Sequence, residues 1–162
     1  MKKVVKFGGS SLANAEQFQK VGDIIRSDES RRYVVPSAPG KRFSADTKVT
    51  DLLYTCYGKA EAGEDFTDVL TEIKGRFYEI IKGLNLDLSL EEEFRQIEAD
   101  FKAHAGNEYA ASRGEFLNGK VMAAYLGYEF IDSATVIRFD KNGNFDADKT
   151  DKLLSKRLQK CE

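Results

Sequence analysis

The first eleven residues constrain the fold of this chain most, because an apolar run breaks there into two glycines and two serines. Residues 4–7 suit a buried β-strand, since β-branched and aromatic side chains pack well on a pleated surface. Gly8 and Gly9 lack a Cβ, which lets backbone N–H groups approach a ligand closely. A helical pattern follows, and the start of a helix attracts anions through its unpaired amides and its dipole. With Lys6 beside the glycines, the stretch predicts a phosphate site at a strand-to-helix turn.

An ordinary turn with a solvated lysine is the alternative interpretation of the same stretch. The sequence contains neither the G-x-x-x-x-G-K-[ST] pattern of a Walker A loop nor the G-x-G-x-x-G fingerprint of a dinucleotide site. These two classes of nucleotide site are therefore not indicated. Features elsewhere in the sequence are needed to distinguish a phosphate site from an ordinary turn.

A second apolar run completes a strand–helix–strand unit within the first 36 residues. Asn14 and Gln17 resemble a capping box, and apolar residues then recur at helical spacing up to about residue 26. Arg31–Pro36 reads as a second buried strand, and a loop rich in proline, glycine and small residues follows it. Ligands bind at the carboxyl ends of strands in open α/β sheets. We therefore expect residues 8–11 and 37–40 to lie on one rim; two unrelated surface turns are the alternative.

The segment from about residue 47 to 106 is predicted to be a helical insertion without strands. Apolar residues recur at three- and four-residue spacing through residues 52–56 and 66–84. Ser89 and Glu92 match a capping box, which predicts another helix up to about residue 101. The charged residues of this segment read as solvated helix faces.

The remaining residues predict a helix over 108–126, ended by Gly127 as a C-cap. A glycine inside a helix costs up to about 1 kcal/mol relative to alanine, so Gly114 indicates close packing or a nearby ligand. Residues 128–132 and 136–139 read as a third and a fourth strand, the latter followed by an Asn-Gly turn, and residues 146–159 as a final helix. So few strands against so many helices look like the front portion of a larger α/β domain.

Composition narrows the classes of partner. The 162 residues include 25 basic and 27 acidic side chains, well mixed, which indicates neither a nucleic acid nor an anionic membrane as partner. No apolar run approaches the roughly 18 residues of a membrane span, and the first strand is too short for a signal-peptide core. Two distant cysteines and one histidine leave little material for a disulfide framework, a histidine-based triad or a zinc site. We expect a cytoplasmic protein.

Four segments in order resemble motifs of the aspartokinases, which belong to the amino acid kinase family. They are residues 6–11 (KFGGSS), 34–38 (VVPSA), 49–53 (VTDLL) and 112–116 (SRGEF). The helical insertion also falls where aspartokinases carry one. Pro36 and Pro39 depart from the family pattern by stiffening a loop that often lacks both prolines.

The resemblance implies an α/β fold, the three-layer αβα amino acid kinase fold with a mainly parallel sheet. It implies transfer of the ATP γ-phosphoryl group to the side-chain carboxylate of L-aspartate, with Mg2+ bridging phosphate oxygens. The product, aspartyl phosphate, opens lysine, threonine and methionine biosynthesis. It also implies a homo-oligomer for the intact protein.

The same resemblance implies roles for individual residues and no metal ligand in this chain. Lys6 becomes the catalytic lysine on the ATP phosphates, and Thr50 and Glu115 become aspartate contacts. The further contacts implied are with phosphate for Gly8, Gly9 and Ser10, and with the substrate rim for Ser37 and Ala38. These roles suit phosphoryl transfer, which asks mainly for positioning and for stabilisation of charge, and Glu115 suits the substrate ammonium.

The motifs lead us to expect that residues 1–162 form the N-terminal part of a kinase catalytic domain, without its C-terminal half and without regulatory domains. The isolated chain should then have little or no kinase activity. One alternative is another kinase of the family that acts on a carboxylate or phosphate, such as a glutamate, acetylglutamate or uridylate kinase. A second is a non-catalytic fragment that self-associates through an exposed sheet edge.

Overall fold

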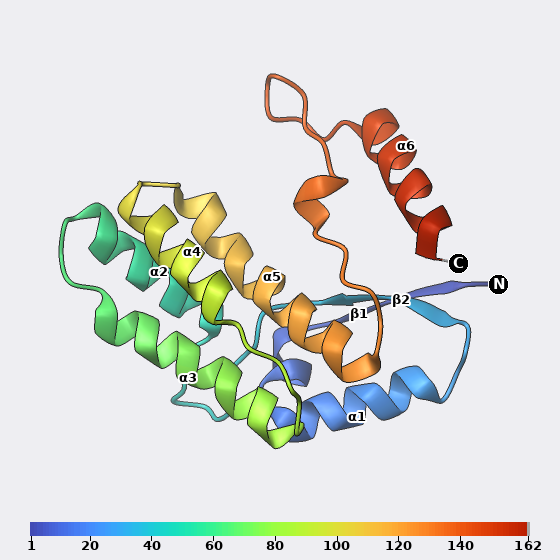
Figure 1. Ribbon diagram of the computed structural model, residues 1–162, viewed down its shortest axis with the longest axis horizontal. Helices are drawn as coiled ribbons and strands as arrows, with labels where there is room; N and C mark the ends of the chain where they lie inside the picture. The colour runs from blue at the N-terminus through green and yellow to red at the C-terminus, as the bar shows by residue number, and fades with distance from the viewer. Residues whose placement is uncertain (162) are drawn as a thin grey trace. The chain divides into compact units, whose positions relative to one another are not determined.

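The first 36 residues form the predicted strand–helix–strand unit in the computed structural model, which describes residues 1–161 (Figure 1). Strand β1, Lys3–Phe7, pairs in parallel with β2, Arg31–Pro36. A short 3-10 helix, η1, covers Gly9–Leu12 and separates β1 from helix α1, Ala15–Arg26. The glycine turn therefore leads first into a short 3-10 helix and only then into the predicted α-helix.

The start of α1 is capped as its sequence predicts. The side chain of Asn14 accepts a hydrogen bond from the backbone N–H of Gln17 at 3.0 Å, which satisfies one of the free donors at a helix start. Three apolar residues of the helix are buried at the spacing that the sequence shows: Phe18, Val21 and Ile25.

The two strands are covered on one face only. Val5 and Val34 pack against the core, whereas Val4 is 68% and Val35 50% exposed on the opposite face. The expectation of buried strands therefore holds for one face of each strand in this structure. A β-branched run shows that a segment suits a strand, but it does not show whether one or two layers cover it.

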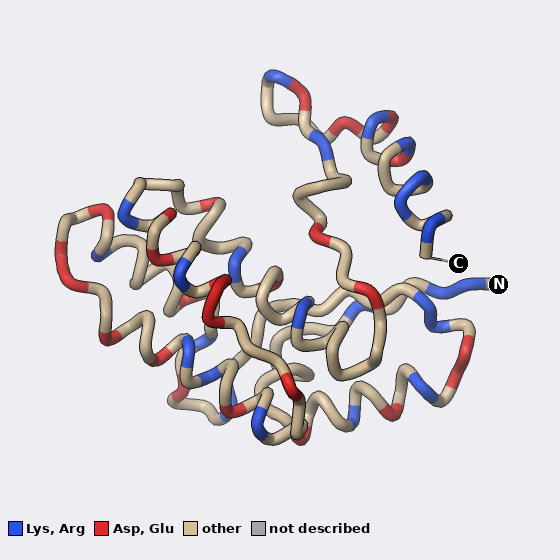
Figure 2. Tube along the Cα trace, viewed as in Figure 1, with Lys and Arg blue, Asp and Glu red and all other residues tan. Residues whose placement is uncertain are grey.

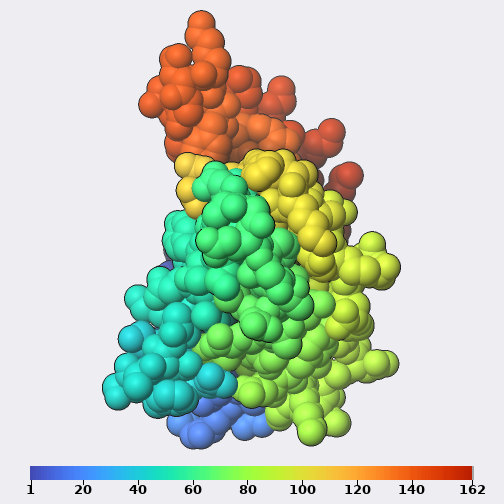
Figure 3. All heavy atoms as spheres, turned by 90° about the vertical axis from the view of Figure 1, so that its left-hand side faces the viewer, coloured from blue at the N-terminus to red at the C-terminus, as the bar shows by residue number. Residues whose placement is uncertain are grey.

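Four helices follow in the same unit and supply most of the residues of its hydrophobic core. They are α2, Val49–Glu61; α3, Thr67–Gly83; α4, Glu91–Lys102; and α5, Asn107–Leu126. Aromatic side chains meet edge to face between them: Tyr57 lies 5.4 Å from Phe101, and Phe77 lies 6.1 Å from Phe94, between ring centroids. The packed atoms of α2, α3 and α4 form the closed surface in Figure 3. The predicted all-helical stretch between residues 47 and 106 is confirmed.

The caps of these helices were predicted with mixed success. Gly127 ends α5 in the left-handed conformation, with φ 70°, as a C-cap glycine should. The capping box of Ser89 and Glu92 is wrong. Helix α4 starts one residue later than that box requires, and the Ser89 hydroxyl accepts from the N–H of Glu91 instead. Glu92 pairs with a surface arginine, Arg95, which competes for its carboxylate.

The chain divides into two compact units, Met1–Tyr128 and the smaller Glu129–Glu162, whose described part ends at residue 161. This unit contains η2, Ser133–Thr135, then α6, Ala147–Leu158, and η3, Gln159–Cys161. The predicted final helix is confirmed, and its N-cap Asp146 accepts from the N–H of Lys149 at 3.0 Å.

The third and fourth strands predicted from the sequence are wrong. Residues 128–132 have no regular secondary structure, and Phe139 makes only an isolated antiparallel bridge to Phe145, around a turn at Gly143. A strand exists only where its backbone groups pair with a neighbour, and the residue pattern does not supply that neighbour. The α/β fold class is confirmed, with a two-stranded parallel sheet among the described residues.

Charged residues of both signs are interspersed along the helices (Figure 2). None of the described helices combines the length and the apolar character that a membrane span needs.

Candidate functional site

The loops that follow β1 and β2 touch each other. The N–H of Gly40 donates to the carbonyl oxygen of Gly9 at 2.8 Å, and the N–H of Ser37 donates to that of Phe7 at 3.0 Å. A Cβ on Gly40 would lie 2.6 Å from the carbonyl carbon of Gly9, and a Cβ on Gly9 would lie 2.9 Å from the carbonyl oxygen of Ala38. Both glycines are therefore required by the contact between the loops. The prediction that the two loops share a rim is confirmed.

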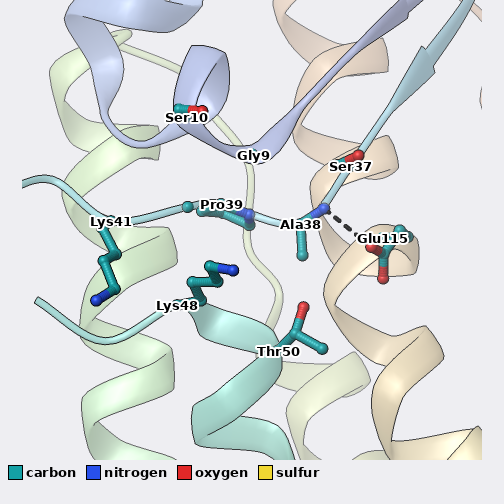
Figure 4. Close-up of a pocket in the computed structure, with 10 residues that line it drawn as sticks. Gly9, Ser10, Ser37, Ala38, Pro39, Lys41, Lys48, Thr50 and Glu115 are labelled. Carbon is teal, nitrogen blue, oxygen red and sulfur yellow. Dashed lines mark hydrogen bonds between the residues drawn. The ribbon is translucent and has the colours of Figure 1, made fainter.

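A cavity of about 430 Å³ opens beside this contact (Figure 4). It is lined by Gly9, Ser10, Ser37, Ala38, Pro39, Gly40, Lys41, Lys48, Thr50 and Glu115. Of the predicted site residues, the lining brings together Gly9, Ser10, Ser37, Ala38, Thr50 and Glu115. These six residues come from all four motif segments, so segments far apart in sequence converge on one site.

Lys6 and Gly8, the other two predicted phosphate residues, do not line this cavity. Lys6 is exposed on β1, and its Nζ lies 4.0 Å from the position that a Cβ on Gly8 would take. Gly8 itself is the N-cap of η1. The ammonium group therefore lies beside the glycine turn, at the entrance to η1, while the cavity extends from Gly9 onward.

Helix α5 docks directly on the loop after β2. The N–H of Ala38 donates to Oε1 of Glu115 at 3.2 Å, and Nδ2 of Asn118 donates to the carbonyl oxygen of Ser37 at 2.6 Å. A Cβ on Gly114 would lie 2.6 Å from the Cβ of Ala38. Of the two readings of Gly114, close packing is the one the structure bears out, and this packing places Glu115 at the rim.

Asn118 is a site residue that the sequence analysis missed. Its side chain is fully buried, and its Oδ1 has no hydrogen-bond partner among the described residues. The signal was present, because Asn118 interrupts the apolar positions Leu117 and Val121 of the helix. A buried amide is retained where it satisfies a backbone group, here the Ser37 carbonyl.

The loop from residue 41 to 47 is held by a buried arginine that was also missed. Arg76 of α3 is 2% exposed and donates from Nη2 to the carbonyl oxygen of Gly40 at 2.6 Å and from Nη1 to that of Thr47 at 2.8 Å. It also lies 3.2 Å from the carboxylate of Asp46. Burial lowers the pKa of Arg76. The expectation that charges of this segment are only solvated faces is wrong at this position.

Asp46 binds a second arginine within the same loop. The backbone N–H and the Nε of Arg42 donate to Asp46 at 2.8 and 2.9 Å, and Nη1 of Arg42 pairs with Glu79 of α3 at 2.9 Å. The hydrogen bonds from the Arg42 side chain hold the pKa of Asp46 well below its ordinary value, against the opposing effect of burial. The loop is therefore tied to α3 by both of its arginine contacts.

Helix α2 begins at the cavity. Lys48 is its N-cap, Thr50 lies in its first turn, and the N–H of Val49 donates to the carbonyl oxygen of Pro39 at 3.1 Å. The first amides of a helix lack partners within it and carry partial positive charge. The ammonium group of Lys48 and a helix start thus face the cavity from one side and the Glu115 carboxylate from another, while the Lys41 ammonium contacts the Ser44 carbonyl. This arrangement suits a ligand that carries both negative and positive groups.

The sequence as a whole matches one known family. A model of the amino acid kinase family matches residues 1–160, so the chain belongs to that family. Among curated proteins it is similar to aspartokinase 3 of Bacillus subtilis, with 39% identity over 141 residues, which cover 83% of this chain and 31% of the relative. It is also similar to the chloroplastic aspartokinase 1 of Arabidopsis thaliana, with 32% identity over 136 residues, covering 76% and 23%.

Solved structures agree with these relatives. The aspartate kinase of Clostridium acetobutylicum superposes with a TM-score of 0.93 and 47% identity, over 98% of this chain and 36% of that one. Aspartokinase III of E. coli, at 24% identity and a TM-score of 0.78 over 98% of this chain and 38% of that one, shows the same fold. The resemblance to aspartokinases is confirmed. The chain spans about a third of the length of the relatives named first.

Proposed function

We propose that this chain is part of an ATP-dependent aspartate kinase, which transfers the γ-phosphoryl group of ATP to the side-chain carboxylate of L-aspartate and gives aspartyl phosphate. Family membership and the similarity to aspartokinases support the reaction class. The observation that carries the proposal is the convergence of Ser10, Thr50 and Glu115 on one cavity beside the glycine loops. The enzyme would act in the cytoplasm, in the biosynthesis of lysine, threonine and methionine.

The β1 loop would hold the phosphates. Phosphoryl transfer requires the protein chiefly to position the reactants and to stabilise charge on the transferred group. The exposed ammonium of Lys6 and the amides of Gly8 and Gly9 are suited to that task, and the Ser10 hydroxyl lines the adjoining cavity. Lys6 is accordingly the catalytic residue of the proposal.

The α2 and α5 residues would hold the acceptor. Thr50 offers a hydroxyl for a carboxylate, and Glu115 offers a carboxylate for the substrate ammonium. One oxygen of Glu115 already accepts from Ala38, and an ionised carboxylate has acceptor capacity left for a second donor. Ser37 and Ala38 would form the wall of the cavity between Thr50 and Glu115.

Mg2+ would arrive with the nucleotide. The described residues contain no group of three or more histidine, cysteine, aspartate and glutamate side chains placed to hold a metal ion. Mg2+ usually keeps several waters and binds through substrate phosphates and one or two carboxylates. Bound there, it neutralises charge on the phosphate oxygens. The E. coli aspartokinase III structure contains aspartate and ADP, and its likeness to this chain is one of fold.

The domain assignment is part of the same proposal. We infer that residues 1–162 correspond to the N-terminal part of a kinase catalytic domain, with residues of about 47–106 as its helical insertion, and that the intact protein is a homo-oligomer. The extent of the match, about a third of each relative named first, supports the domain assignment.

Isothermal titration calorimetry with L-aspartate and with MgATP tests the proposal. Glu115→Gln keeps an acceptor for the Ala38 N–H but removes the charge, so it should weaken L-aspartate binding by about tenfold or more, equal to about 1.4 kcal/mol. Lys6→Ala should weaken MgATP binding in the same way. Glu108→Gln, exposed in the first turn of the same helix, is the matched control.

Equal L-aspartate affinity in Glu115→Gln and the unmodified chain would refute the assigned role. Binding of L-glutamate, N-acetylglutamate or UMP in preference to L-aspartate would instead favour another kinase of the family.

A further inference from the structure

Two lysines outside the four motif segments reach the cavity, Lys41 and Lys48 (Figure 4). Lys41 has its Nζ 3.4 Å from the carbonyl oxygen of Ser44. Lys48 makes no side-chain hydrogen bond or ion pair within residues 1–161, and in Figure 4 its ammonium group points into the space between Pro39 and Thr50. A cationic group without a protein partner is thus directed into the proposed site.

The position of Lys48 is set by the loop that precedes it. Arg76 donates to the carbonyl oxygens of Gly40 and Thr47, the residues immediately before Lys41 and Lys48. One buried side chain therefore fixes both ends of loop 41–47. This loop lies at the surface beside α3, cyan against green in Figure 3. A site whose charged groups are held in place before binding loses less conformational freedom when the ligand arrives.

The charges of the cavity indicate which ligand group Lys48 meets. Glu115 is the only carboxylate among the lining residues, and Lys48 is the lining lysine whose ammonium group points toward the space beside Thr50 (Figure 4). Of the residues that the proposed function assigns to the ATP phosphates, Gly9 and Ser10 line the cavity, but Lys6, the one cation among them, does not. Lys48 is therefore available to the acceptor. In an amino acid with two carboxylates and one ammonium, a carboxylate would pair with Lys48 and the ammonium with Glu115.

We propose that Lys48 is a substrate-binding residue that holds a carboxylate of the amino acid acceptor, and that Arg76 positions it through loop 41–47. The inference rests on the function proposed above and adds a residue to the same site. The two lysines then have different roles: Lys6 binds the phosphates of the nucleotide, and Lys48 binds a carboxylate of the acceptor.

Calorimetry on the 162-residue chain with L-aspartate and with succinate tests the role of Lys48. Succinate keeps both carboxylates of aspartate but lacks the ammonium, so it reports on Lys48 without Glu115. Lys48→Met should weaken binding of both ligands by about tenfold or more, equal to about 1.4 kcal/mol. Lys82→Met, exposed on α3, is the control and should stay within about twofold.

Two outcomes would overturn the inference: unchanged affinity in Lys48→Met, or no binding of either dicarboxylate by the unmodified chain. If Lys48→Met loses succinate while L-aspartate binds no better than succinate and Glu115→Gln has no effect, the assignment to aspartate fails and the role of Lys48 stands.

A double-mutant cycle tests the role of Arg76. If Arg76 acts through Lys48, Arg76→Met alone should weaken L-aspartate binding, and the double variant should bind no more weakly than Lys48→Met alone. Losses that add would refute positioning, because a general structural effect is independent of Lys48. Circular dichroism checks the fold of each variant. Asp46→Asn, which keeps the side-chain shape and loosens the same loop, serves as the second perturbation and should behave like Arg76→Met.

Discussion

Replacing Gly114 by alanine would force a methyl group into the contact between α5 and the loop after β2. The new Cβ would lie 2.6 Å from the Cβ of Ala38 and 3.3 Å from Cδ1 of Leu53, well inside the contact distance of about 3.5–4.0 Å. Overpacking of this kind costs about 1–3 kcal/mol, whereas alanine gains up to about 1 kcal/mol over glycine in a helix interior. We expect a net loss of about 0–2 kcal/mol in the free energy of unfolding.

Gly75→Ala provides the matched control for this change. Gly75 lies inside α3, is exposed, and has no atom within 4 Å of the position of a Cβ. It should therefore show the helix gain alone, so the two variants should differ by about 1–3 kcal/mol in urea denaturation.

The clash in Gly114→Ala is with a single methyl group, which makes the reasoning refutable. Ala38→Gly removes that methyl, so the double variant should recover part of the loss relative to the sum of the single variants. If Gly114→Ala proves as stabilising as Gly75→Ala, α5 does not contact the loop as closely as described, and the support for Glu115 at the rim fails with it.

Two further predictions follow from charge and burial, and a third follows from how much of its relatives the chain spans. The pKa of Asp46 is lowered in the folded chain, so the unfolded chain binds more protons, and the stability that Asp46 contributes is present at neutral pH and is lost as pH falls below about 4. Asp46→Asn should therefore destabilise the chain by about 1–3 kcal/mol at pH 7 and by less at pH 3, as urea denaturation measures; a constant difference would contradict this. Burial raises the pKa of Cys56 to about 12, so iodoacetamide at pH 8 should modify the half-buried Cys161 first and Cys56 only in urea, as mass spectrometry of the products can show. The isolated chain should give little or no aspartyl phosphate in a hydroxamate assay, because it spans only about a third of the length of the relatives named first; measurable turnover would refute that.

Local signals explain which parts of the fold the sequence predicts. The helices α1 and α5 were predicted almost to the residue, because the Asn14 cap, the Gly127 cap and the apolar spacing all lie within the helix or beside it. The strands at 128–132 and 136–139 were wrong, because a strand depends on a partner elsewhere in the chain. The residue pattern shows that a segment is compatible with a β-strand, but the strand forms only if its backbone pairs with a neighbouring strand.

The candidate site divides in the same way. Gly9, Thr50 and Glu115 were found because each lies in a segment that resembles a family motif, and the structure brings all three to one cavity. Arg76 was missed because its acceptors lie 29 and 36 residues away, so no local pattern distinguishes it from a solvated arginine. The one sign in the sequence that Arg76 could be buried was its position directly before Phe77, which is fully buried.

The two hydrogen bonds that Arg76 donates, to the carbonyl oxygens of Gly40 and Thr47, fix the ends of loop 41–47 but do not involve its tip. Phe43 is 60% exposed, and Ser44 and Ala45 are exposed as well, so the tip is free to carry a foreign group while the clamped ends keep their place. An environment-sensitive dye on Ser44→Cys, with Cys161→Ser and the buried Cys56 left in place, would sit next to the carbonyl that Lys41 contacts. The chain would then act as an optical sensor, whose colour reports the filling of its own cavity.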